Sequence, residues 1–223
     1  MVRNRFFAGL LIWGTLPCFL PVCNGKIPGR QDLEQNLPIR IRVYNYVSVA
    51  DGQLSAGQKI ADRVLEKAGI HATWQECPVR SDRKQSMPTC ADDLSKLVLY
   101  VYLVERLERT VPSVSRNALG FSIIPEENEG ATMAYVGYPR VCALVSSISF
   151  RAEELLGLVM AHEVGHVLLG TNAHSNQGIM RATWRRGHLD ARDWEEFEFT
   201  QVQTKRLRAA VLSRMSPEEQ SAR

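Results

Sequence analysis

The sequence of 223 residues is poor in net charge, in cysteine and in repeated segments. The formal net charge is +3, and no basic run is interleaved with aromatic residues, which argues against a nucleic-acid partner. The five cysteines show no spacing typical of a cysteine-ligated zinc site. Because no internal repeat or second domain boundary is evident, we expect one domain of ordinary size with its own hydrophobic core.

The apolar stretch near the start of the chain is short for a membrane anchor. Arg3 and Arg5 precede it, and Pro17 and Pro21 interrupt it. A charged start, a short apolar run and small residues at its end are typical of a secretory signal peptide. We therefore expect residues 1–25 to direct export, to the periplasm or the extracellular space, without stable membrane insertion. An uncleaved anchor is the alternative.

Export favours disulfide bonds, because the compartments beyond the cytoplasm are oxidising. Cys77 and Cys90 flank a polar loop and are predicted to be bonded, which would stabilise the fold by about 3 kcal/mol. Two free thiols in a mobile loop are the alternative. Cys142 lies in an apolar run and is predicted to be a buried strand residue.

The pattern of apolar residues predicts six strands. Alternation over 39–44 predicts a strand with one face buried, and the nearly unbroken apolar run 97–104 predicts a central strand buried on both faces. The other predicted strands are 71–75, 120–124, 131–138 and 140–145.

Helical spacing follows the first strand. Asp51-Gly52 predicts a turn, and a capping box from Ser55 to Gln58 predicts the start of a helix that ends at Gly69. Its apolar stripe is predicted to face the core: Ile60, Val64, Leu65 and Ala68. The strand-helix-strand order predicts that the strands at 39–44 and 71–75 pair in parallel.

The segment HEVGH at 162–166 is the strongest indication of function. It lies in an apolar run that predicts a buried helix beginning near Ser149. Residues four apart on a helix point the same way, so His162 and His166 can bind one zinc ion. Glu163 lies between them, where it can act as a general base on a water at the open position of that ion. A pair of satisfied core histidines is the alternative, and it is costly without a partner.

A catalytic zinc ion needs three protein ligands and one open position. His174 is the predicted third ligand, because Gly170 can end the helix and let the chain turn back. The rival is a glutamate on a last helix, predicted to start at Asp190. Three glutamates are candidates on it: Glu195, Glu196 and Glu198. Four apolar residues are predicted to pack that helix on the body: Trp194, Phe197, Leu207 and Val211.

Together these residues resemble the metzincin zinc peptidases, and most of all their matrixin-like branch. Seven residues carry the resemblance: His162, Glu163, His166, Gly170, His174, Ser175 and Met180. The spacing departs from the usual pattern, because the gaps from His166 to Gly170 and from Gly170 to His174 are each four residues instead of three.

The resemblance implies an α+β fold, in which a mixed twisted sheet with an antiparallel edge strand packs on an active-site helix, and a C-terminal helix follows. It implies that residues 131–138 form that edge strand and offer backbone groups to a peptide. It also implies that Met180 forms an apolar floor below the metal. Selectivity is expected from residues after Met180, including Trp184 and His188.

We therefore expect a secreted catalytic domain over residues 38–213, preceded by a flexible lead-in at 26–37 and followed by a disordered tail at 214–223. The predicted function is a zinc-dependent endopeptidase that uses one Zn²⁺ ion, is a monomer and acts on protein or peptide substrates. Two alternatives remain open: a non-catalytic zinc-stabilised binding module, and a zinc hydrolase of a non-peptide amide.

Overall fold

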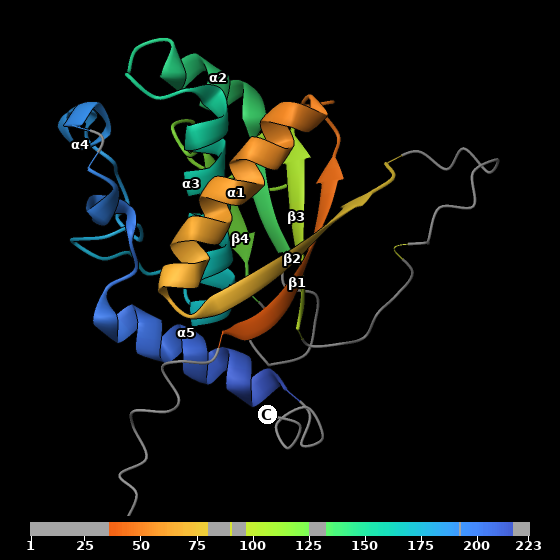
Figure 1. Cartoon of the computed structure of the whole chain (residues 1–223). Helices are drawn as coiled ribbons and strands as arrows, with labels where there is room; N and C mark the ends of the chain where they lie inside the picture. The colour runs from red at the N-terminus through yellow and green to blue at the C-terminus, as the bar shows by residue number, and fades with distance from the viewer. Residues whose placement is uncertain (1–35, 80–89, 91–96, 125–132, 192, 216–223) are drawn as a thin grey trace, which may run out of the picture.

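A five-stranded mixed sheet forms the centre of the computed structural model, which describes residues 36–79, 90, 97–124, 133–191 and 193–215 (Figure 1). The strand order is β2-β1-β3-β5-β4, and every neighbouring pair is parallel except β4 with β5, which is antiparallel. The strands are β1 (Leu37–Asn45), β2 (Ile70–Cys77), β3 (Val98–Val104), β4 (Gly120–Ile123) and β5 (Met133–Gly137). The predicted mixed sheet and the parallel β1–β2 pair are confirmed.

The antiparallel edge strand is β4, so its predicted location at residues 131–138 was wrong. β5 falls in that range, but it lies inside the sheet and pairs in parallel with β3. β4 pairs antiparallel with β5 and takes the outer place in the strand order. Alternation of side chains cannot distinguish these two arrangements, because the pairing partner is remote in sequence.

Two helices, α1 (Asp51–Lys67) and α3 (Ala152–Leu169), lie side by side on one face of the sheet (Figure 1). They approach closely at paired glycines: a Cβ on Gly157 would lie 2.4 Å from the Gly57 carbonyl oxygen. The remaining elements are η1 (Leu107–Arg109), α2 (Tyr138–Val145), α4 (Arg186–Ala191), η2 (Trp194–Phe197) and α5 (Gln201–Arg214).

The C-terminal helix α5 crosses the ends of the other two helices. Arg208 donates to the Gly69 carbonyl oxygen (2.8 Å), and Arg214 donates to the Val167 carbonyl oxygen (3.0 Å). A cation is favourable at Val167, because the carbonyl groups of the last turn of α3 have no partner within the helix. Gly69 lies just past the end of α1, and its carbonyl also accepts from the Leu37 N–H (2.9 Å). The predicted contacts of Phe197, Leu207 and Val211 with the core are confirmed, and Trp194 is partly buried against it.

The central strand β3 is buried on one face only, so the prediction of two buried faces was half right. Leu99, Val101 and Leu103 pack in the core, whereas the other face carries half-buried tyrosines. Stacked rings cross that face from strand to strand, with centroids 5.1 Å apart for Tyr44–Tyr102 and 4.8 Å apart for both Tyr102–Tyr135 and Phe121–Tyr135. The rings meet because these residues are direct partners in the strand register.

The predicted start of the first helix and the predicted strand at 140–145 were wrong. Helix α1 begins at Asp51, not at Ser55, because the turn before it is made earlier, where the Asn45 side chain bonds the backbone N–H and carbonyl of Val49 (2.9 and 2.8 Å). Residues 140–145 form part of helix α2 instead of a strand, and Cys142 is a free, half-buried residue of that helix. Pro139 lies in the first turn of α2, where its missing N–H costs nothing.

The last helix begins later than Asp190. The chain passes through α4 and η2 first, and α5 starts after Thr200. Thr200 and Gln203 form a capping box, in which the Thr200 hydroxyl accepts from the Gln203 N–H (3.3 Å) and the Gln203 side chain accepts from the Thr200 N–H (2.9 Å). The prediction took Asp190 as the start of the last helix, whereas this capping box marks the start of α5.

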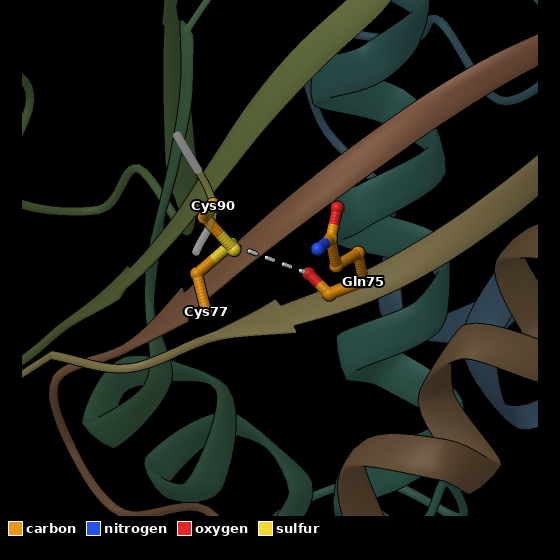
Figure 2. Close-up of a disulfide and its surroundings, with 3 residues drawn as sticks. All are labelled: Gln75, Cys77 and Cys90. Atoms are coloured by element: carbon orange, nitrogen blue, oxygen red, sulfur yellow. Dashed lines mark hydrogen bonds between the residues drawn. A yellow bond between two sulfur atoms is a disulfide. The ribbon is translucent and has the colours of Figure 1, made fainter. Parts of the chain in front are cut away.

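The predicted Cys77–Cys90 disulfide is present (Figure 2). Cys77 Sγ lies 3.8 Å from the Gln75 carbonyl oxygen, a van der Waals contact, because a disulfide sulfur carries no proton to donate. The bond attaches Cys90 to the end of β2. The loop residues 80–89 lie outside the described part of the chain.

Several predictions fall outside the described residues. The signal peptide, most of the lead-in and most of the tail belong to residues 1–35 and 216–223. Among the helices that the structure does describe, none is both long enough and apolar enough to span a membrane.

Candidate metal centre

The candidate site is built on α3, the most deeply buried helix of the fold. The helix begins at Ala152 instead of near Ser149, because the Glu154 side chain accepts the Arg151 backbone N–H (2.9 Å) in a capping box. Every residue from 154 to 168 is buried. Gly170 ends the helix in the left-handed conformation (φ 63°), as predicted, and turns the chain back toward the metal-site face.

Three histidine rings converge at this turn. His166 Nε2 lies 3.0 Å from His162 Nε2 and 3.3 Å from His174 Nε2. The ligand atoms of all three lie within 4.8 Å of one another. Two nitrogens that share one tetrahedral zinc ion at about 2.0–2.1 Å lie about 3.3 Å apart, so these separations suit a single ion.

The other ring nitrogens determine which protons the rings carry. His162 Nδ1 lies 2.8 Å from the Ile179 carbonyl oxygen, and His166 Nδ1 lies 2.8 Å from the Thr171 carbonyl oxygen. A carbonyl oxygen only accepts, so both Nδ1 atoms carry the proton and donate. In neutral rings both Nε2 atoms then present bare lone pairs to each other. Such a pair cannot form a hydrogen bond, and a cation between them satisfies both.

The electrostatics of the site keep the rings neutral. Burial, with the neighbouring His166 as a second cause, lowers the pKa of His162 to about 3. Burial also lowers the pKa of His166 and that of His174. Neutral imidazole is the form that binds a metal ion, so the donor set fits zinc in its chemistry as well as in its geometry.

Glu163 is buried beside the histidines and faces the edge strand. Its exposed fraction is 4%, and burial raises its pKa to about 8, although a hydrogen bond from Ser122 opposes part of this rise. Ser122 Oγ lies 2.8 Å from Glu163 Oε2 and 2.9 Å from the Glu163 carbonyl oxygen. The sequence did not identify Ser122 as a site residue, because the residue pattern of a short strand does not show which helix the strand will pack against.

A cleft of about 930 Å³ opens over the three histidines. One wall is formed by β4 and the segment before it, and the other by residues 181–184. Its apolar lining residues include Val111, Val114, Leu144 and Val159. Among the described residues that line it, Glu163 is the only carboxylate, and Arg181 is the only arginine or lysine. Arg181 is already paired with Glu196 and donates to the Asn176 carbonyl oxygen (3.0 Å).

The segment after the histidines packs against α3. Met180 is fully buried, and a Cβ on Gly165 of α3 would lie 2.7 Å from its Sδ. Trp184 lines the cleft, donates from Nε1 to the Ile179 carbonyl oxygen (3.1 Å) and meets the His162 ring edge-on. His188 lies on α4 and is not among the residues that line the cleft.

The glutamates considered as rival ligands have other partners or places. Glu196 pairs with Arg181, and Glu198 pairs with Lys67. Glu195 lies on η2 with Glu196, outside the α-helix on which they were expected. In the part of the chain that the structure describes, the group that could hold a metal ion consists of His162, His166 and His174.

Comparison with known proteins finds a likeness to solved structures. No family model matches the sequence, and no curated protein matches it. Among solved structures, the crystal structure of an archaemetzincin from Methanopyrus kandleri is similar to this chain, with 13% sequence identity and a TM-score of 0.45. The alignment covers 83% of this chain and 99% of the archaemetzincin. At so low an identity, the function has to be inferred from the residues of this chain.

Proposed function

We propose that the chain is a secreted zinc-dependent endopeptidase of the metzincin type, with His162, His166 and His174 as metal ligands and Glu163 as general base. One observation carries the proposal: the Nδ1 atoms of His162 and His166 donate to carbonyl oxygens, so that two bare Nε2 atoms meet 3.0 Å apart and a third histidine completes the group. A cation accounts for this arrangement, and a hydrogen-bonded core does not.

A zinc ion held by these rings supplies a Lewis acid that polarises a carbonyl and acidifies a water molecule. The protein supplies the proton transfer. Glu163 Oε2 accepts from Ser122, which leaves Oε1 to take the proton of the attacking water and to pass it to the leaving amine nitrogen. Burial favours this role, because a raised pKa brings the carboxyl group close to the operating pH of most hydrolases.

The cleft suits an extended chain passing through it. Among the described residues β4 pairs with β5 alone, and residues of β4 line the cleft, so the other edge of β4 can pair with a peptide backbone. An exopeptidase needs a charged side chain that pairs with the terminal amino or carboxylate group of its substrate. The described lining offers only Glu163, which is assigned to proton transfer, and Arg181, which is paired with Glu196. This favours cleavage within a chain.

Export is part of the proposal on two grounds. The charged and apolar start of the sequence has the composition of a signal peptide. The Cys77–Cys90 disulfide is of the kind that persists in oxidising compartments. The matrixin-like branch remains a prediction from the motif, as does the monomeric state.

Glu163→Ala tests the catalytic part of the proposal. The variant is expected to keep one zinc ion per chain and to lose about 10²–10⁴-fold in kcat on a denatured protein substrate. A metal-binding module without catalysis predicts no zinc-dependent cleavage by the wild type. A hydrolase of non-peptide amides predicts turnover of small amides but not of peptides. Equal cleavage by the variant and the wild type would exclude Glu163 as the base.

A further inference from the structure

The carboxylate of Glu163 is held by two residues of the edge strand, Gly120 and Ser122. They are two apart on β4, so they face the same side of the sheet, toward α3. Phe121 between them faces the opposite side and stacks on Tyr135. The β4–β5 register, with Ser122 opposite Ala134, fixes both positions in the sheet.

Ser122 supplies the attractive contact. Its hydroxyl lies within hydrogen-bond distance of two acceptors, Glu163 Oε2 (2.8 Å) and the Glu163 carbonyl oxygen (2.9 Å). A hydroxyl has one proton, and a carboxylate is a stronger acceptor than a carbonyl. Ser122 is itself only 8% exposed, so little water competes for this hydrogen bond.

Gly120 supplies the space. A Cβ at this position would lie 2.7 Å from Glu163 Oε1 and 2.8 Å from Glu163 Cγ. Real side chains do not approach so closely, so any other residue would displace the Glu163 side chain or the strand. The two oxygens are therefore distinguished by β4: Oε2 is bonded to Ser122, and Oε1 occupies the space beside Gly120.

We propose that Ser122 is a positioning residue for Glu163, whose hydroxyl fixes the carboxylate through Oε2 and leaves Oε1 available for proton transfer. This inference rests on the proposed role of Glu163. It adds that the strand that binds the substrate backbone also orients the general base, so that the base and the scissile bond share one rigid support.

The first test uses metal-free protein and needs no activity. Thermal unfolding is measured for wild type, Ser122→Ala, Glu163→Ala and the double variant. In Glu163→Ala the Ser122 hydroxyl can still donate to the backbone carbonyl oxygen of position 163, so the cycle measures how much stronger its hydrogen bond to the carboxyl group is. The hydroxyl–carboxyl bond predicts that Ser122→Ala lowers the melting temperature by at least about 3 °C more in the wild-type background than in Glu163→Ala. Additive shifts would overturn the proposal, whatever reaction the protein performs.

The second test uses zinc-loaded protein. Ser122→Ala is expected to lower kcat about 10- to 100-fold, with KM and zinc content unchanged. Ser122→Thr, which keeps the hydroxyl, is expected to restore most of the rate. Ser146→Ala is the matched control, because its hydroxyl also bonds a backbone carbonyl, that of Ala143 (2.7 Å), away from the cleft. If Ser122→Ala and the wild type are equally active, the positioning role is overturned and the proposed function is not. If the wild type is inactive, the result counts against the proposed function. The unfolding cycle still tests whether Ser122 bonds Glu163 in that case.

Discussion

His162 and His166 face each other through their Nε2 atoms at 3.0 Å, while the Nδ1 atom of each ring donates to a carbonyl oxygen of the segment that follows the helix. The acceptors are Ile179, in the turn after His174, and Thr171, just before it. The loop that carries the third histidine therefore also orients the first two. Such outer contacts fix the tautomer and the direction of metal-binding histidines.

Acid should destabilise the metal-free protein through His162. Its pKa is about 3 in the folded chain, against about 6.5 in the unfolded chain. Between these pH values the unfolded state binds a proton at this ring and the folded state does not. The stability it contributes is present above about pH 6.5 and is lost as the pH falls toward 3, by at most about 1.4 kcal/mol per pH unit.

Urea unfolding of wild type and His162→Asn at pH 8 and pH 5 measures this effect. The variant is expected to lose less stability on acidification. The raised pKa of Glu163 has the opposite sign, since it favours folding as the pH falls from about 8, but it is common to both proteins. Parallel pH profiles would contradict the assignment of a neutral, buried His162.

His174→Ala should weaken zinc binding by more than about 100-fold, because the loss of a ligand costs more than the loss of an outer contact, which typically costs 10–100-fold. Competition with a chelator of known affinity provides the measurement. His71→Ala is the control, because His71 is exposed on β2, outside the group of three. Unchanged affinity in His174→Ala would show that another group completes the site.

Tyr102 lies in the middle of the row of stacked rings, between Tyr44 and Tyr135. Tyr102→Ala removes these two stacked pairs and a third, wider pair with Tyr46, and is expected to cost about 1–3 kcal/mol beyond the lost buried area. Tyr102→Phe keeps the rings stacked and should cost far less. Chemical unfolding of the two variants compares them, and equal losses would mean that stacking contributes nothing.

The phenol of Tyr102 should titrate late. Burial, reinforced by the neighbouring phenols of Tyr135 and Tyr44, raises its pKa to about 12, against about 10 when unfolded. Its contribution to stability is therefore complete below about pH 10 and is lost as the pH rises through 12. Burial raises the pKa of Tyr138 to about 12 as well, so the most alkaline step of the phenolate absorbance should shrink, and not vanish, in Tyr102→Phe. A loss of phenolate absorbance near pH 10 in this variant, with the most alkaline step unchanged, would refute the shift.

Cys77→Ser should destabilise the protein by about 3 kcal/mol. The disulfide closes a loop with a sequence separation of 13 and thereby lowers the conformational entropy of the unfolded chain. Cys142→Ser is the control, since Cys142 is free. Reductant should reproduce the loss in the wild type and leave Cys77→Ser unaffected. A wild type indifferent to reductant would indicate that the bond does not stabilise the fold.

Local geometry explains what could be predicted from the sequence. The spacing of His162 and His166 needs only a helix, and Gly170 needs only a left-handed cap, so both were predictable from a few neighbouring residues. The β1–α1–β2 unit was predictable for the same reason, because its two parallel strands are joined by a single helix and are close in sequence.

Non-local contacts explain what could not be predicted. Residues 140–145 form a short apolar run that fits a strand as well as a helix, and their place beside α3 favours the helix. The order of β4 and β5 depends on which of the two strands pairs with β3, and that strand is β5. The contact between Ser122 and Glu163 joins residues 41 apart in sequence, and the periodicity of apolar residues within either element does not predict it.

A structure of the zinc-loaded mature chain, with the anomalous signal of the metal, tests the central claim most directly. The account predicts one zinc ion bound by Nε2 of His162, His166 and His174 at about 2.0–2.1 Å, with one further position open to solvent and Glu163 close by but not bound. A zinc ion bound by other side chains, or purified protein that takes up no zinc, would contradict it.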